Sequence, residues 1–345
     1  MGIEIAQIPG AVARVLNASD AELRSVADAV ARARPRWIMI AGRGTSDHAA
    51  VYAQYLFETQ LGLPTGLVKP SVTTIYGASI DWRDGIVVAI SQSGRSPDVV
   101  AVVAAARRAG AVTVAITNEP RSPLASAAEW ELRCHAGREL AIPATKTYVA
   151  ELAVIAWLVA RVRPTDELRE GLAALPDALR GTIELTHRWL GGPGASAIQA
   201  MAAADRALLV SRGYNFATVL ELALKLKETC GIFAEGYSTA DFAHGPLVLA
   251  RPEVPTLAIR PDGLIGAEID RTLAAVAQRG GRTTVIGGSE VAGVPGALAL
   301  PHSLPESLTP LLFVVPGQLL VEATALRRGV SPDAPTGLGK VTLTR

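Results

Sequence analysis

The sequence predicts an α/β protein made of two copies of one unit, each a parallel β-sheet with helices on both faces. Short apolar runs rich in β-branched residues alternate with segments of helical spacing, which is the order typical of parallel sheets. Glycines, an Arg-Gly pair and apolar runs of the first half of the chain recur in the second half at a fixed separation in sequence. The length of 345 residues suits two domains, each large enough to bury its own core.

The duplication becomes visible when the sequence is shifted by 169 positions, the distance from Arg43 to Arg212. Both strand and turn residues then coincide. The coincident pairs are Arg43-Gly44 with Arg212-Gly213, Gly62 with Gly231, Val88-Ala-Ile90 with Leu257-Ala-Ile259, Gly94 with Gly263, and, with a small drift, Val112 to Ile116 with Thr283 to Ile286. So many matches at one offset are hard to obtain by chance, and they indicate an internal repeat.

The elements of the first copy follow an N-terminal helical arm, residues 1–34, in which Asn17 to Asp20 marks a break. The first domain is expected at residues 35–164. Its elements are predicted as a strand at 37–41, a helix at 47–61 that ends at Gly62, a short strand around Val68 and Ile75, strands at 86–90 and 112–117, and a helix at 99–109 between these two. This βαβαβ order predicts a parallel sheet.

A linker rich in proline and glycine, residues 165–194, separates the copies and is expected to be mainly one helix. The second domain is expected at residues 195–330. A tail, residues 331–345, follows and contains a single lysine, Lys340. The proline- and glycine-rich sequence of this tail is also typical of a frayed terminus.

The turn after the strand at 86–90 is the predicted ligand site. Ser91-Gln-Ser-Gly94 lies at the carboxyl end of that strand, where open α/β sheets bind ligands, and Ser96-Pro97-Asp98 is a typical helix start. Free N–H groups, serine hydroxyls and a glycine form a neutral cradle for phosphate, although an ordinary turn uses the same residue types. The second copy has Arg260-Pro-Asp-Gly263, whose acid would face a phosphate, so only the first copy is expected to bind one.

A charged helix opens the second copy, from Val219 to Gly231. Glu221, Lys225 and Glu228 fall at i, i+4 and i+7 and therefore share one face. A solvated face with an ordinary ion pair is the simpler interpretation. Against it, leucines surround the charged residues, and the helix dipole disfavours an anion in the last turn. We therefore predict a buried helix in which Glu228 serves as an acid-base group.

His244 follows ten or so residues later and is fixed by Gly245-Pro246, which can aim an imidazole, although a single histidine is also an ordinary surface residue. The net charge of +1 gives no basis for binding nucleic acid or a membrane surface. The first residues lack a secretory signal, and the apolar stretch Val149 to Val162 is too short to span a membrane, so we expect a cytoplasmic protein. Cys134 and Cys230 are expected to be reduced and buried.

Together these motifs resemble the sugar isomerase (SIS) domain family, in particular the isomerase half of glucosamine-fructose-6-phosphate aminotransferase and stand-alone glucosamine-6-phosphate deaminases of the isomerase-domain type. The likeness extends over nearly the whole chain. It rests on Glu4-Ile5, Pro9, Gly44-Thr-Ser46, Ser91-Gln-Ser-Gly94, Glu221 to Glu228, His244-Gly-Pro246 and Lys340. The resemblance implies two tandem SIS domains, each a flavodoxin-like three-layer αβα sandwich.

The resemblance also implies roles for particular residues. It implies that the sugar phosphate is bound by Gly44, Thr45, Ser46, Ser91, Gln92, Ser93 and Ser96. Lys225 is also expected to be a substrate-binding residue. Glu228 would move the proton between the first two sugar carbons, His244 would open the ring and Lys340 would contact the open-chain sugar. The family places the histidine in the neighbouring subunit's site, which implies a homodimer. No metal and no cofactor are implied.

The sequence departs from the family pattern in two places that bear on sugar selectivity: Arg95-Ser96 replaces a common Glu-Thr, and Pro143-Ala-Thr-Lys146 replaces an Ala-Ser-Thr-Lys run. The sequence starts at the isomerase part, without a glutaminase domain, so we do not expect this chain alone to make an amino sugar from glutamine. The leading expectation is an enzyme that converts an amino-sugar phosphate into a ketose phosphate and ammonia. A plain phosphosugar isomerase or a fructosamine-type deglycase uses the same carboxylate chemistry, and a sugar-phosphate sensor is a further alternative.

Overall fold

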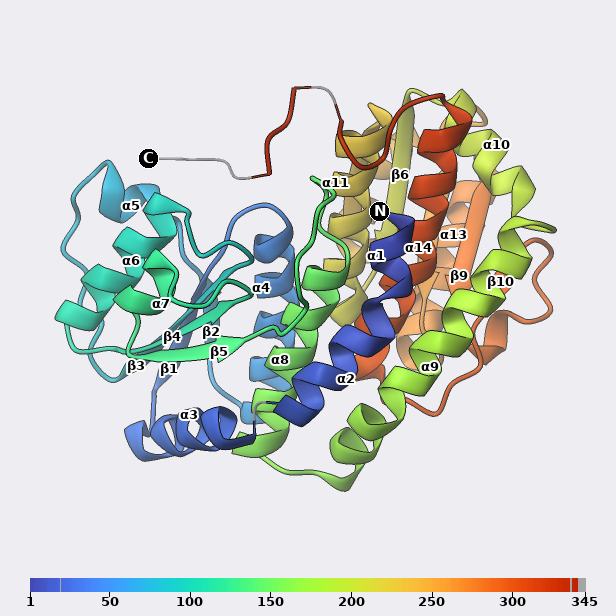
Figure 1. Cartoon of the computed structure of the whole chain (residues 1–345). Coiled ribbons are helices and arrows are strands. Elements are labelled where there is room, and N and C mark those ends of the chain that lie inside the picture. Colours follow the sequence, from blue (N-terminus) through green and yellow to red (C-terminus); the bar gives the residue numbers. More distant parts are fainter. Residues whose placement is uncertain (19, 336, 341–345) are drawn as a thin grey trace. The chain divides into compact units, whose positions relative to one another are not determined.

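The computed structural model describes residues 1–18, 20–335 and 337–340. Parts of two predictions, the break at Asn17 to Asp20 and the tail at 331–345, therefore lie outside the described residues. The chain divides into two compact units, and each contains one parallel five-stranded sheet (Figure 1). We call the unit of residues 7–139, 146–173 and 339–340 the serine unit, and the unit of residues 1–6, 140–145 and 174–338 the histidine unit.

The sheet of the serine unit has the strand order β2-β1-β3-β4-β5, with all neighbours parallel. Its strands are β1 (Trp37–Ala41), β2 (Thr65–Leu67), β3 (Gly85–Ser91), β4 (Val112–Thr117) and β5 (Trp130–Arg133). Every residue of β3 is buried, as its continuous apolar sequence predicts for a central strand covered on both faces.

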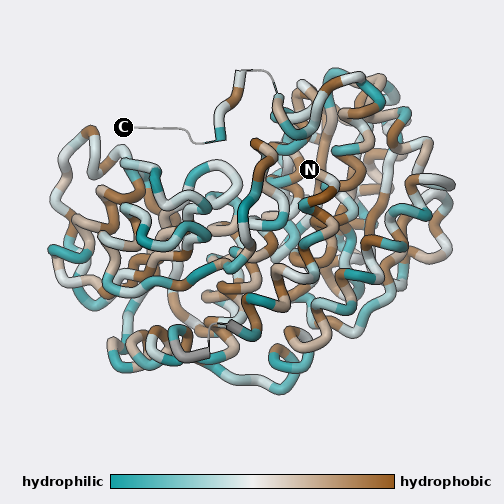
Figure 2. Tube along the Cα trace, in the orientation of Figure 1, coloured by the Kyte–Doolittle hydropathy of each residue, from teal (hydrophilic) through white to brown (hydrophobic). Residues whose placement is uncertain are grey.

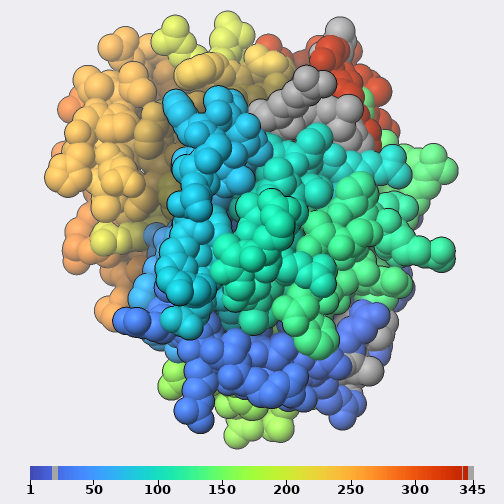
Figure 3. Space-filling view, turned by 90° about the vertical axis from the view of Figure 1, so that its left-hand side faces the viewer, coloured from blue at the N-terminus to red at the C-terminus, as the bar shows by residue number. Residues whose placement is uncertain are grey.

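Helices cover both faces of this sheet. They are α2 (Ile8–Ala18), α3 (Asp20–Ala33), α4 (Thr45–Leu56), α5 (Ser71–Thr74), α6 (Pro97–Arg108), α7 (Pro123–Ala127) and α8 (Lys146–Val162), and a π-helical turn, η1 (Phe57–Leu61), continues α4. Val87 and Ala89 of β3 pack with α6 and α7 in one apolar cluster, whereas the alternate residues of β3 face the other side. In Figure 3, which faces this unit, the cyan segment of α5 lies against the teal segment of α6.

The predicted position of the second strand is wrong in part. Strand β2 comprises Thr65–Leu67, before Val68, and Ile75 directly follows the short helix α5 and is 69% exposed. The first, third and fourth strands lie where they were predicted, within one residue at each end. The edge strand β5 has the polar sequence Trp-Glu-Leu-Arg and was not predicted.

The histidine unit repeats this arrangement. Its sheet has the order β7-β6-β8-β9-β10, and all its neighbours are parallel. Its main elements are α1 (Gly2–Ala6), α10 (Ala195–Ala203), β6 (Arg206–Ser211), α11 (Phe216–Cys230), β7 (Phe233–Ser238), α12 (Thr239–Ala243), β8 (Thr256–Arg260), α13 (Leu264–Gln278), β9 (Thr283–Gly287), β10 (Leu298–Ala299) and α14 (Thr309–Arg327). Helix α9 (Asp166–Leu190) crosses the predicted linker, and both its polar and apolar residues are visible in Figure 2.

The backbones of the two units match at positions of the sequence repeat. Ala41 pairs with Ala89 in the first sheet, and Val210 pairs with Ala258, 169 positions later, in the second. The three glycine pairs of the repeat all have positive φ: Gly44 (54°) with Gly213 (65°), Gly62 (69°) with Gly231 (64°), and Gly94 (62°) with Gly263 (84°). Glycine adopts this conformation at little cost, so matched turns explain why it recurs at matched positions.

The segment Glu306–Arg327, which contains α14, is the only described one long and apolar enough to cross a membrane by length and composition. It is 89% buried over its most apolar window. Within the histidine unit it packs against α11 and α10 (Figure 1). Its apolar character is therefore that of a core helix.

Candidate functional site

Two turns of the serine unit form the predicted cradle, and the sheet brings them together. One turn, residues 42–46, joins β1 to α4, and the other, residues 91–97, joins β3 to α6. Strands β1 and β3 are hydrogen-bonded neighbours, with Ala41 opposite Ala89, so both turns leave the same carboxyl edge of the sheet side by side. Ligands of such sheets bind at this edge.

The turn after β3 is tightly organised. The N–H of Gly94 donates to Ser91 Oγ (3.1 Å), and the N–H of Arg95 donates to Ser93 Oγ (3.3 Å). A Cβ atom at Gly94 would lie 2.1 Å from Ser122 Oγ, so only glycine fits here. Ser91 is buried, whereas Ser93 and Ser96 are half-buried. These two half-buried hydroxyls are the ones that a ligand can reach.

The turn after β1 contributes less than predicted through Ser46. The Ser46 hydroxyl is buried and donates to Glu151 Oε1 of α8 (3.0 Å). The backbone N–H of Ser46 donates to the carbonyl of Arg43 (3.1 Å), so Ser46 could donate to a phosphate only if one of these two hydrogen bonds were broken. Thr45 is half-buried, and Gly44 is exposed.

Two helices start at this cradle, and among the described residues neither has a side-chain cap. Gly44 precedes α4 and Ser96 precedes α6, and no side-chain hydrogen bond is made at either cap position. The first N–H groups of a helix have no partner within it and carry the positive end of the helix dipole. The positive ends of these two helices, beside the half-buried hydroxyls of Ser93 and Ser96, form a suitable site for an anion such as phosphate, although Asp98 Oδ1 already accepts the N–H of Val99 at the start of α6 (2.9 Å).

The matching turn of the histidine unit is closed. Arg260 occupies the position of Ser91, and its guanidinium contacts Asp270 (2.8 Å) and Glu290 (2.6 Å). These hydrogen bonds raise the pKa of Arg260, the one from Asp270 most of all. Glu290 also accepts the N–H of Gly263 at the start of α13 (3.3 Å), which is where an anion would bind. An internal carboxylate thus occupies this position, consistent with the prediction that only the first copy binds phosphate.

The charged face of α11 is buried, so the interpretation as a solvated face is wrong. Lys225 Nζ lies 3.4 Å from Glu221 Oε1 and 2.6 Å from Glu228 Oε2. The side chains of Glu221 and Lys225 are 0% and 1% exposed, whereas that of Glu228 is 25% exposed. Glu228 is therefore the member of this cluster that a substrate can reach.

Lys225 stabilises the cluster electrostatically, because its ammonium pairs with the carboxylates of both Glu221 and Glu228. Burial alone would lower the pKa of Lys225, but the carboxylates of Glu221 and Glu228 outweigh it and raise this pKa above its usual value. Breaking a buried pair of this kind typically costs about 3–5 kcal/mol, because one charge stays buried without its partner. Since the ammonium of Lys225 is covered, the structure supports a role in orienting Glu228 better than direct contact with a sugar.

His244 and Lys340 lie in different units. His244 is exposed at the end of the short helix α12, where Gly245 has a φ of 151° and Pro246 begins the next turn. Lys340, in the serine unit, has its Nζ 3.6 Å from the fully buried carboxylate of Glu139, which also accepts the N–H of Thr147 (3.3 Å). Neither Glu139 nor Glu151 was predicted as a site residue, although a carboxylate near or within an apolar run was a signal for both.

The cysteines are free and buried, as predicted. Burial raises the pKa of the Cys134 thiol, and the nearby carboxylates of Glu151 and Glu139 raise it further. Such a thiol is a poor nucleophile. Within the part of the chain that the structure describes, no three His, Cys, Asp or Glu side chains are grouped as a metal site.

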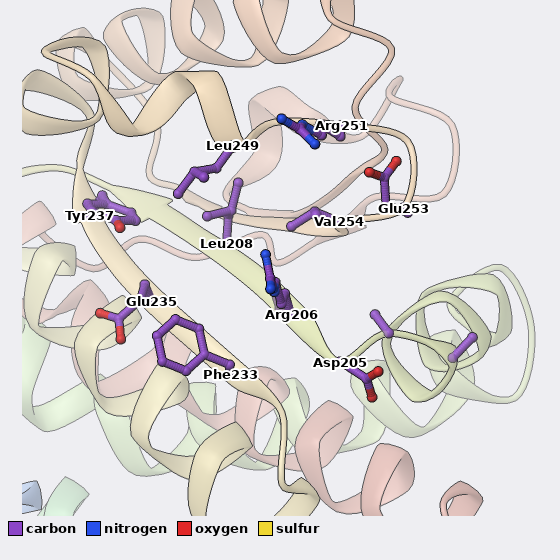
Figure 4. A pocket seen from close by; sticks show the side chains of 13 residues that line it. Asp205, Arg206, Leu208, Phe233, Glu235, Tyr237, Leu249, Arg251, Glu253 and Val254 are labelled. Carbon is purple, nitrogen blue, oxygen red and sulfur yellow. The ribbon is translucent and has the colours of Figure 1, made fainter.

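A cavity of about 890 Å³ lies elsewhere, over β6 and β7 of the histidine unit (Figure 4). Arg206 and Phe233, the first residues of these strands, line it together with Tyr237, Leu249 and Arg251. None of the predicted site residues lines it. Because it extends to the amino ends of the strands, it is a less suitable substrate site than the cradle.

The comparisons with known proteins agree with this fold. The SIS domain model matches residues 33–161. The isomerizing glutamine-fructose-6-phosphate aminotransferase of Methanothermobacter thermautotrophicus is 33% identical over 86% of this chain, and the chain spans about half the length of that relative (50%).

Two solved structures are also similar. A provisionally assigned phosphosugar isomerase from Silicibacter pomeroyi DSS-3 is 34% identical, with a TM-score of 0.85 over 96% of this chain and 98% of the other. The glucosamine-6-phosphate deaminase of Thermotoga maritima shares the fold, with a TM-score of 0.72 and 21% identity over 97% of this chain and 100% of the other. At this level of identity and coverage, the chain belongs to the sugar isomerase (SIS) domain family.

Proposed function

We propose that the protein is an amino-sugar phosphate deaminase with an isomerase mechanism, acting on glucosamine 6-phosphate or a close relative. The observation that carries the chemistry is Glu228, a partly exposed carboxylate held by the buried Lys225. Such a group is fixed in place and can exchange protons with a substrate. The starts of α4 and α6, whose N-cap residues make no side-chain hydrogen bond, and the half-buried hydroxyls of Ser93 and Ser96 beside them support a substrate that carries a phosphate.

The proposed reaction opens the sugar ring first. His244 transfers a proton to the ring oxygen as the C1 hydroxyl loses one, which gives an open-chain aldehyde. Glu228 then takes the proton from C2 and returns it to C1, while the C1 oxygen gains a proton and the C2 nitrogen loses one, so that the double bond moves from the C1 oxygen to the C2 nitrogen. Water adds at C2 and ammonia leaves, giving a ketose phosphate. The overall change is a hydrolysis without net oxidation, and its balance requires no redox partner.

We further propose that the histidine unit is a second SIS-type domain whose cradle has become closed. The matched strand order, the matched register and the matched glycines support this proposal. Lys340 is proposed to contact the open-chain sugar. A homodimer that acts in the cytoplasm is the proposed working form.

The reaction is tested by assaying the purified protein with a panel of phosphorylated amino sugars while measuring both ammonia and ketose phosphate. We expect equal amounts of the two products from at least one substrate, and none from unphosphorylated glucosamine. Interconversion of aldose and ketose phosphates without ammonia would instead identify a plain isomerase. Tight binding of sugar phosphates without turnover of any of them would favour the alternative that the protein is a non-catalytic sugar-phosphate sensor.

Substitution of Ser93 tests the phosphate site. Calorimetric titration with a substrate analogue should show one site per chain, and Ser93→Ala should weaken binding by about 1–3 kcal/mol because a hydrogen bond to a charged group is lost. Asp262→Ala, at the matched position of the closed turn, is the control and should leave affinity unchanged. Two equal sites in each chain would contradict the assignment.

A further inference from the structure

An ion pair joins the two turns of the cradle. Arg43 lies directly before Gly44, and its Nε and Nη2 atoms contact Asp98 Oδ2 at 2.7 and 2.6 Å. Asp98 lies in the first turn of α6, 55 residues further along the chain. The side chain of Asp98 is 0% exposed and that of Arg43 is 45% exposed. The pair thus connects the starts of both helices that form the cradle.

The buried carboxylate is placed where a phosphate is expected to bind. Asp98 Oδ1 accepts the N–H of Val99 (2.9 Å), so this carboxylate already uses the positive start of α6. Two anions at one helix start repel each other, and the repulsion is strong where little water separates the charges. Without compensation, Asp98 would work against binding of a doubly charged phosphate.

We infer that Arg43 is a positioning residue for the phosphate: its guanidinium neutralises the buried carboxylate of Asp98, so that the serine cradle can accept a dianion. This inference rests on the proposed function of the cradle. The hydroxyls and N–H groups of the cradle carry no net charge, so the charge of a buried carboxylate at the start of α6 matters for affinity. The geometry fits this role, because both contacts of Arg43 go to the carboxylate oxygen that does not bond to Val99.

The histidine unit contains a matched pair that serves as a control. Arg212 occupies the repeat position of Arg43 and contacts Glu268 of α13. Here the acid is 38% exposed, and Arg271 contacts it as well (3.2 Å). The adjoining turn is the closed one. Breaking this pair therefore removes the same kind of contact without leaving a buried charge beside an open cradle.

The test is calorimetric titration of the full-length protein with inorganic phosphate near neutral pH. Removing one partner of a buried charge pair leaves the other uncompensated, so Arg43→Met should weaken binding roughly 30-fold or more. Asp98→Asn removes the repelling charge and should not weaken binding. The double variant should return to within about threefold of wild type, a non-additive recovery that marks direct coupling.

Two further variants separate charge compensation from simple tethering of the turns. Arg43→Lys keeps the charge but not both contacts, and should retain most of the affinity. Arg212→Met should leave affinity unchanged. If Asp98→Asn weakens binding as much as Arg43→Met, and the double variant does not recover, the pair is only a tether and the inference is wrong. If wild type itself binds no phosphate, both the inference and the proposed cradle fail. If Arg43→Met folds too poorly to measure, the double variant and Arg43→Lys still decide the question.

Discussion

Glu228→Gln is expected to reduce kcat by about 10² to 10⁴ while leaving the affinity for a substrate analogue nearly unchanged. Gln keeps the shape of the side chain, and its amide oxygen can still accept the bond from Lys225 Nζ that Glu228 Oε2 accepts at 2.6 Å. The amide cannot take a proton from carbon. Steady-state kinetics combined with calorimetric binding of the analogue separates these two effects.

The matched control is Glu235→Gln. Glu235 also pairs with a lysine of α11, Lys227 (3.4 Å), but both side chains are about 40% exposed (41% and 40%). An exposed pair contributes little to stability, so this variant should retain full activity. Full activity of the Glu228→Gln variant would show that the cluster is structural and that another group moves the proton.

Mixing two inactive variants is expected to restore activity if His244 completes the site of a partner subunit. In a two-fold dimer that shares its sites, a heterodimer of Glu228→Gln and His244→Ala chains has one site with both lesions and one with neither. Each heterodimer should then have about half the activity of a wild-type dimer, while each parent dimer stays inactive. The exposed position of His244 at the end of α12 is compatible with such a contribution.

The measurement is the rate of ammonia release as a function of the mixing ratio, after subunit exchange has been verified by mass spectrometry of differently tagged chains. The control is a mixture in which one chain carries both substitutions and the other carries neither. No recovery at any ratio, with exchange confirmed, would mean that each chain uses its own histidine. Sedimentation of the wild-type protein as a monomer would exclude the shared site directly.

Features set by local sequence could be predicted. The charged face of α11 follows from the helical period alone, because Glu221, Lys225 and Glu228 must share a face once the helix forms. The start of α6 at Pro97 follows from the Ser-Pro-Asp sequence, since proline favours the first position of a helix. The central strand β3 was equally clear, because its apolar run is long enough to distinguish it from a turn.

Features set by distant contacts could not be predicted. Ser46 and Glu151 are 105 residues apart in sequence, and only the packing of α4 on α8 brings the hydroxyl to the carboxylate. The Arg43 pair with Asp98 likewise depends on the adjacency of β1 and β3. The short strands β5 and β10 are edge strands with too few residues to show a period.

The closed turn of the histidine unit has a consequence for how the repeat is interpreted. The carboxylate of Glu290 at the N–H of Gly263 imitates a bound anion, and it is tethered to the chain and cannot diffuse away. The second turn therefore contains a carboxylate of the chain itself at the position where we propose that the first turn binds phosphate. The second turn thus gives, within the same chain, an example of how an anion can contact a turn of this architecture.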